Sequence, residues 1–214
     1  MNRFFLFFLI SFFFSCEKQS YQIGDIFFQD LDCGAPCQAI EAVTSGYQGA
    51  QLSHCAIITS IGTSNYDTIL TEAIGETVTQ TTLHDFLNRS NKVFVGRLKD
   101  EYQYMIPDAI TYIQTDLNGK PYDYIFDITD DTYYCSEIIY EGLKIADRSQ
   151  ELFSLRPMTF NEPGTDMPFV HWVEYYEDLG HPIPEGELGL NPGGMSRSDA
   201  IEIIHIYEKP TGMY

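Results

Sequence analysis

A cysteine, Cys135, stands where an aspartate-rich stretch (residues 127–132) gives way to an apolar segment with helical spacing. A cysteine in the first turn of a helix meets the positive end of the helix dipole and backbone N–H groups without intrahelical partners. Both favour the thiolate, which is the nucleophilic form of the side chain. The alternative is a buried structural cysteine, so the interpretation depends on finding a base that matches it.

His54 and Glu72 are the matching candidates, because they lie in two strand-like stretches that flank a predicted turn. If residues 62–64 form that turn, His54 faces Glu72 directly across a hairpin, with about 5 Å between their Cβ atoms. The carboxylate would then accept a ring N–H and hold His54 in one tautomer. A turn with an even number of residues would instead place the two side chains on opposite faces of the sheet.

The energetics show why the cysteine needs a histidine. Lowering the pKa of a thiol from about 8.5 to about 5 corresponds to roughly 5 kcal/mol of preference for the charged form. A helix N-terminus supplies at most about 2 kcal/mol. An imidazolium beside the sulfur must therefore supply much of the rest, and the distance between the groups matters more than their order in the sequence.

The elements that must position these residues follow from apolar periodicity and turn residues. We expect an α+β fold, in which an antiparallel sheet has helices packed beside it. Residues 157–199 are rich in Pro and Gly and predict a long, partly structured region with a short element at 170–179. Strands are expected at residues 23–29, 53–61, 66–74, 77–80, 92–97 and 200–207, and helices at 36–45, 82–88, 108–117 and 133–146.

The N-terminus reads as a targeting segment. Arg3 precedes an apolar run, Phe4–Phe14, which is too short to span a bilayer and typical of a signal-peptide core. The following Ser15-Cys16 resembles a bacterial lipoprotein cleavage site. We therefore expect a signal peptide at 1–16 with cleavage before Cys16, lipidation of Cys16, a tether at 17–22 and one hydrolase domain at 23–214. The expected location is the cell envelope, outside the cytoplasm and anchored to a membrane surface by lipid; secretion and an uncleaved anchor are the alternatives.

Charge and cysteine content limit the partners. The formal net charge of −19 disfavours binding to nucleic acid. Cys33 and Cys37 are spaced for a disulfide in an oxidising compartment, and zinc bound by them with His54 or Cys55 is the rival interpretation. We expect neither a cofactor nor a metal.

Five strings resemble one family, the permuted papain-like amidases of the YiiX/YaeF type, which are relatives of the NlpC-type cell-wall peptidases. They are GDIFFQ (24–29), SHCAII (53–58), TEAIG (71–75), GKPYDYIF (119–126) and YYCSEIIY (133–140). The resemblance implies a circularly permuted papain-like fold, with Cys135 as nucleophile, His54 as base and Glu72 as orienting acid. Cys55 departs from the family pattern, and we expect it to pack in the core on the opposite strand face.

The implied activity is a cysteine hydrolase that forms an acyl-enzyme with an amide or ester carbonyl. The backbone N–H of Cys135 is the natural oxyanion donor. Tyr122 and Gln29 are candidates for contacting substrate or oxyanion; a half-buried aromatic and an exposed strand end are the alternatives. Glu137, two residues after Cys135 on the helix, points elsewhere, and we expect it to have a surface or salt-bridge role. The resemblance implies cell-wall peptides or N-acyl amino-acid amides as substrates. A non-catalytic module that binds a peptide or amino acid, and a thiol acyltransferase, are the rival functions.

Overall fold

The computed structural model describes residues 21–148 and 152–214. The expected signal peptide, its Cys16 and most of the 17–22 tether lie outside these residues. Within the described ranges, no helix is both long and apolar enough to cross a membrane.

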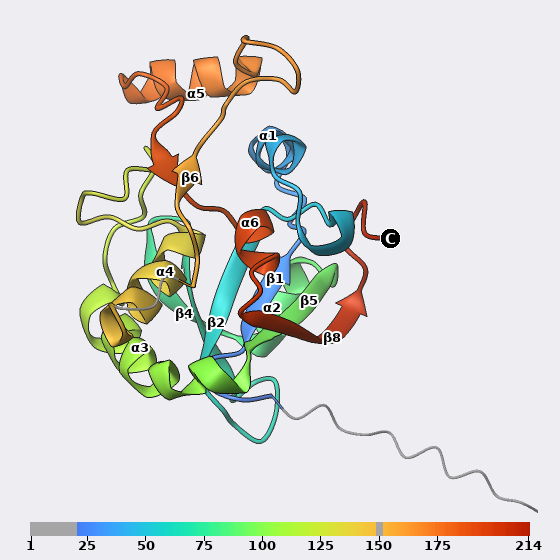
Figure 1. The fold of residues 1–214 in the computed structure, drawn as a ribbon, viewed down its shortest axis with the longest axis vertical. Coiled ribbons are helices and arrows are strands. Elements are labelled where there is room, and N and C mark those ends of the chain that lie inside the picture. Colours follow the sequence, from blue (N-terminus) through green and yellow to red (C-terminus); the bar gives the residue numbers. More distant parts are fainter. Residues whose placement is uncertain (1–20, 149–151) are drawn as a thin grey trace, which may run out of the picture.

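Six antiparallel strands form the main sheet, in the order β4-β3-β2-β1-β5-β8 (Figure 1). The central strands β1 and β2 are buried, apart from Ser60 at the end of β2, because helices cover both faces of the sheet. The strands are β1 (Ile26–Gln29), β2 (His54–Ser60), β3 (Ile69–Ile74), β4 (Thr77–Thr82), β5 (Val93–Leu98) and β8 (Ile201–Glu208).

The two faces of the sheet carry different cores. One face packs against α3 (Ile106–Tyr112), its π-helical continuation η3 (Ile113–Leu117) and α4 (Cys135–Ala146). The other face is covered by α2 (Leu83–Arg89), whose Phe86 packs edge-on against Phe27. Thr82 caps α2 by accepting a hydrogen bond from the backbone of Asp85, as its position before the helix predicts.

A third cluster lies away from the sheet, where α1 (Ala35–Val43) meets α5 (Val170–Leu179) (Figure 1). Trp172 is its centre, with Phe160 and Tyr176 packed around it. The strands β6 (Arg156–Pro157) and β7 (Leu188–Gly189) form a small ribbon that connects this cluster to the rest of the chain. The remaining elements are η1 (Tyr47–Gly49), η2 (Asp100–Met105) and α6 (Pro192–Ser196).

The register of β2 and β3 corrects the sequence-based prediction. Ile57 faces Thr71 and Ile58 faces Leu70, so His54 and Glu72 are not directly opposite. Two features cause the difference. In a longer loop, Asp67 accepts hydrogen bonds from the hydroxyls of Thr63 and Ser64, and β3 begins later than expected, with Ile69 facing Ser60. A bulge between Ile58 and Ser60 then moves the register by one residue. The net shift is two residues and therefore leaves both side chains on the same face.

Candidate active site

Cys135 is the first residue of α4 and is buried. The start of this helix is fixed from two sides. The carboxylate of Glu137 accepts a hydrogen bond from the backbone N–H of Tyr134 (3.2 Å), and the hydroxyl of Tyr134 accepts one from the backbone of Leu190 (3.2 Å). The prediction that Glu137 lies at the surface is wrong: it is 1% exposed, and burial raises its pKa to about 9. Its carboxyl group accepts a hydrogen bond at the start of α4 and does not face the solvent.

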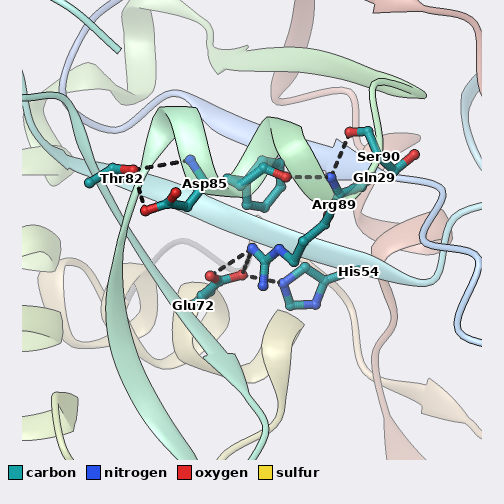
Figure 2. A network of polar contacts seen from close by, with 8 residues as sticks. Gln29, His54, Glu72, Thr82, Asp85, Arg89 and Ser90 are labelled. Carbon is teal, nitrogen blue, oxygen red and sulfur yellow. Dashed lines mark hydrogen bonds and ion pairs between the residues drawn. The ribbon is translucent and has the colours of Figure 1, made fainter. Parts of the chain in front are cut away.

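His54 and Glu72 are in direct contact despite the shifted register. The Nε2 atom of His54 lies 2.6 Å from Oε2 of Glu72, and both residues are buried. Arg89, at the end of α2, donates to both carboxylate oxygens at 2.7 Å (Figure 2). Glu72 is thus held by a guanidinium on one side and an imidazole on the other, which fixes its orientation and that of the ring.

The charges of this group stabilise one another. Burial alone would raise the pKa of Glu72, but the hydrogen bond and charge of His54, together with the charge of Arg89, lower it to about 2. Burial alone would lower the pKa of His54, but its hydrogen bonds with Cys135 and Glu72 raise it to about 9. Around neutral pH the pair is therefore an imidazolium and a carboxylate.

Two neighbours of Cys135, Cys55 and His54, lower the pKa of its thiol. The pKa of Cys135 is lowered first by the side chain of Cys55 and then, against the opposing effect of burial, by the hydrogen bond and charge of His54. Because Nε2 of His54 is occupied by Glu72, Nδ1 is left for the sulfur. The structure thus brings the three predicted residues together, in the order Cys135, His54, Glu72.

Cys55 has a second role beside the expected one. It is fully buried in the core under α4, as predicted. The paired part of β2 and β3 begins only at Ile57, so the start of β2 is open toward the N-terminus of α4, which packs on both strands. The Cys55 thiol and backbone N–H therefore reach the Cys135 sulfur and act as hydrogen-bond donors to it.

Gln29 does not have the geometry of an oxyanion donor. Its side-chain amide is buried and donates to the backbone carbonyls of Phe86 (3.0 Å) and Ser90 (2.9 Å) (Figure 2). Both bonds hold the C-terminal end of α2, which carries Arg89. We therefore assign Gln29 a structural role in place of the predicted substrate contact. Gln29 faces His54 across β1 and β2 and holds the helix that carries Arg89.

A pocket of about 140 Å³ opens beside Cys135, and Tyr122 lines it as predicted. The hydroxyl of Tyr122 has no hydrogen-bond partner within residues 21–148 and 152–214, and burial and then the charge of Cys135 raise its pKa. The far wall is aromatic and apolar and comes from α1, from the stretch that leads into α4 and from the segment after α4. Its largest members are Phe126, Tyr134, Met158, Phe160 and Trp172.

Comparison with known proteins identifies the family of this chain. Residues 20–205 match the family model described as "Permuted papain-like amidase enzyme, YaeF/YiiX, C92 family". The chain belongs to this family. The amidase fold is similar to a crystal structure titled "metalloprotein yiiX from Escherichia coli O157:H7", with a TM-score of 0.66 and 24% identity, covering 88% of this chain and 98% of that one. The expected α+β, permuted papain-like fold is confirmed. No curated protein matches the chain.

The description "metalloprotein" belongs to that solved structure. In this amidase, the part of the chain that the structure describes contains no group of three or more His, Cys, Asp or Glu side chains placed to hold a metal ion. Cys33 and Cys37, the zinc alternative of the sequence analysis, form a disulfide with 5.4 Å between their Cα atoms. The residues present therefore do not fit a metal site, and no catalytic step is derived through one.

Sequence reasoning missed Arg89 and the aromatic wall of the pocket. Arg89 directly follows the predicted helix, in a chain with only 12 basic residues. The scarcity of basic residues is a reason to consider it, but no local pattern links it to Glu72. Three members of this wall, Met158, Phe160 and Trp172, come from the region 157–199 that was expected to be long and only partly structured. The members of the wall meet only when α5 packs on α1.

Proposed function

We propose that this amidase hydrolyses an amide bond through a thiolate of Cys135. The observation that carries the proposal is the connected group of buried side chains, in which Glu72 and Arg89 fix an imidazolium of His54 next to the sulfur. A buried arrangement of this kind stabilises the thiolate before substrate arrives, which is what an acyl-transfer nucleophile requires.

In the proposed reaction the sulfur attacks the amide carbonyl carbon, and the carbonyl oxygen becomes an oxyanion. The backbone N–H of Cys135 lies at the start of α4, where it is available as a donor, and the free hydroxyl of Tyr122 lies in the same pocket. His54 gives its proton to the leaving amine as the C–N bond breaks. It then takes a proton from water, which attacks the thioester and releases the acid and the thiolate.

For the substrate, we propose an amide that carries an apolar group next to the reacting carbonyl. The pocket walls are aromatic and aliphatic on the side away from the sheet, and such walls bind apolar groups by removing them from water. N-acyl amino-acid amides and cell-wall peptides with apolar side chains both meet this description.

The test is a panel of N-acyl amino acids and cell-wall peptide fragments, with released amine measured by mass spectrometry. Wild-type protein should release amine from at least one member, while Cys135→Ala should release none. Cys135→Ser keeps the size of the side chain and should be at least about 10³-fold slower, because a serine is not ionised by this pair. Turnover that is equal in wild type and Cys135→Ala would exclude the mechanism.

Two other functions share the same site. A module that binds a peptide or amino acid without turnover would retain ligands from the panel unchanged, and an acyltransferase would give an acylated acceptor in place of the free acid. The paired Arg89, Glu72 and His54 favour catalysis over binding, because a binding pocket gains nothing from a buried imidazolium beside a thiol. Adding a primary amine to the assay and analysing the products separates hydrolysis from transfer.

Membrane anchoring through Cys16 is also a proposal, and it rests on the sequence alone. A lipidated Cys16 would place the amidase on a membrane surface of the cell envelope. The full chain should then partition into detergent when expressed in a bacterium, and Cys16→Ser should move it to the aqueous phase. Equal partitioning of the two proteins would exclude the lipid anchor.

A further inference from the structure

A second cavity, of about 460 Å³, lies next to the pocket of Cys135. The two cavities have a common wall, because Pro157, Met158, Leu190 and Asn191 line both of them. The second cavity is therefore adjacent to the pocket in which a substrate carbonyl would meet Cys135. Nothing in the proposed reaction uses that space.

The second cavity differs from the first in its charge. Arg156 and Arg197 line it, together with Asp199, so arginines outnumber carboxylates among its lining residues. This is unexpected in a chain with 31 acidic and 12 basic residues. The local charge of this cavity is thus opposite in sign to the net charge of the protein.

The two arginines are also without ionic partners. Within the described residues, five other cations form ion pairs: Arg89 with Glu72, Arg97 with Asp25, Lys92 with buried Asp30 and exposed Asp32, Lys120 with Asp131, and Lys144 with Glu141. Neither Arg156 nor Arg197 forms an ion pair with any residue of the described ranges. Their guanidinium groups therefore remain available for a ligand.

A neutral donor stands between the cavities. The Oδ1 atom of Asn191 accepts a hydrogen bond from the backbone of Gly194 (2.7 Å), which fixes the side chain. Its amide nitrogen has no partner in the part of the chain that the structure describes, and Asn191 lines both cavities. The shared wall thus presents a hydrogen-bond donor beside the arginines.

We propose that the second cavity binds an anionic group, a carboxylate or a phosphate, on the same substrate whose carbonyl reacts at Cys135. Guanidinium groups form paired hydrogen bonds with both anions. The inference rests on the proposed function for the position of the reacting carbonyl. It narrows the substrate class to amides that combine an apolar group with an anion at the other end, as an N-acyl amino acid does.

The test measures binding without turnover. Calorimetry with the full Cys135→Ala chain would compare N-hexanoylglycine and hexyl phosphate with the neutral N-hexanoylglycinamide. At low ionic strength we expect at least one anionic probe to bind about fivefold more tightly than the neutral one, since exposed ion pairs are individually weak. The preferred anion tells whether the cavity takes a carboxylate or a phosphate, and added salt should reduce the preference.

The variant Arg156→Gln/Arg197→Gln should abolish the preference for the anion, while Arg148→Gln, which removes an exposed arginine outside the cavity, should keep it. Both arginines of the cavity are exposed and unpaired, so the double variant should melt like its parent. The proposal is overturned if no anion preference is measured, if none of the three probes binds, or if the preference survives the double variant. Turnover by the wild type does not enter this assay, so a failure here leaves the proposed function to be judged separately.

Discussion

The two walls that flank Cys135 are held together by different kinds of interaction. On the sheet side, buried His54 and Glu72 and half-buried Arg89 are charges with direct partners, held by two strands and α2. On the opposite side, Phe160 and Trp172 belong to an aromatic cluster that stands on α1 and α5. A charged wall must be positioned accurately to stabilise a thiolate, whereas an apolar wall only has to exclude water and fit a shape. The comparison suggests that the first wall sets reactivity and the second sets selectivity.

The largest effect is expected from breaking the charged wall. Glu72→Gln keeps the size of the side chain but removes the charge that holds His54 and Arg89. The rate constant kcat should fall about 10³–10⁴-fold, because the ring loses its tautomer and its imidazolium loses a partner. The free energy of unfolding should fall by about 3–5 kcal/mol, since Arg89 loses its buried counterion. Both are measured by steady-state kinetics and by urea unfolding.

Glu76→Gln provides the matched control, because Glu76 is an exposed acid in the turn after β3. It should leave both quantities within error of wild type. If Glu72→Gln is as active as this control, the charged wall has no part in reactivity.

A smaller effect, and of another kind, is expected from the aromatic wall. Phe160 packs edge-on against Trp172 (5.4 Å between ring centres) and Tyr176 (5.6 Å). Phe160→Ala should raise KM about tenfold by removing apolar contact with the substrate, while the rate at which a small alkylating agent modifies Cys135 stays unchanged. Val170→Ala, at an exposed position of α5, should alter neither. A changed alkylation rate in Phe160→Ala would show that the walls are not independent.

The pH dependence of activity tests the same comparison between the two walls, because the groups expected to set it belong to the charged wall. Activity should fall above pH 9, by about tenfold per unit, as His54 loses the proton needed by the leaving amine. The folded pKa of His54 is raised, so its contribution to stability is present below about pH 6.5 and lost as the pH rises through 9. The folded pKa of Glu72 is lowered, so its contribution is present above pH 4.5 and lost as the pH falls through 2. Unfolding by urea between pH 2 and 10 should be compared in wild type and His54→Ala, because the raised pKa of Glu137 also lowers stability as the pH rises through 9. A profile above pH 7 that is the same in both proteins would contradict the assignment of His54.

The smallest expected effect concerns Cys55, which touches the nucleophile from the core side. Cys55→Ala removes the thiol that donates to Cys135, so the pKa of Cys135 should rise and its alkylation at pH 6 should slow about three- to tenfold. Cys55→Ser retains a donor and should restore most of the rate. An unchanged rate in Cys55→Ala would mean that His54 alone sets the reactivity.

Local signals in the sequence predicted much of this fold. Thr82 before an apolar period indicated the start of α2, and the change from polar turn to apolar stripe indicated the start of α4 at Cys135. The parts that failed depend on the conformation of a loop and on contacts between distant residues. The β2–β3 register is set by side chains within a loop, and the burial of Glu137 is set by packing around α4. Arg89 reaches Glu72 only because Gln29 holds the end of α2, which no local pattern shows.

The most direct test of the account is the pH dependence of alkylation at Cys135, followed by peptide mass spectrometry so that Cys55 is counted separately. Wild-type Cys135 should react with iodoacetamide at nearly its full rate at pH 6, because the sulfur is already a thiolate. In His54→Ala the midpoint should rise toward that of an ordinary thiol, about 8.5, and stay below it because Cys55 still lowers the pKa of Cys135. If wild type and His54→Ala share a midpoint near that of an ordinary thiol, the imidazolium does not activate the sulfur and the central claim is contradicted.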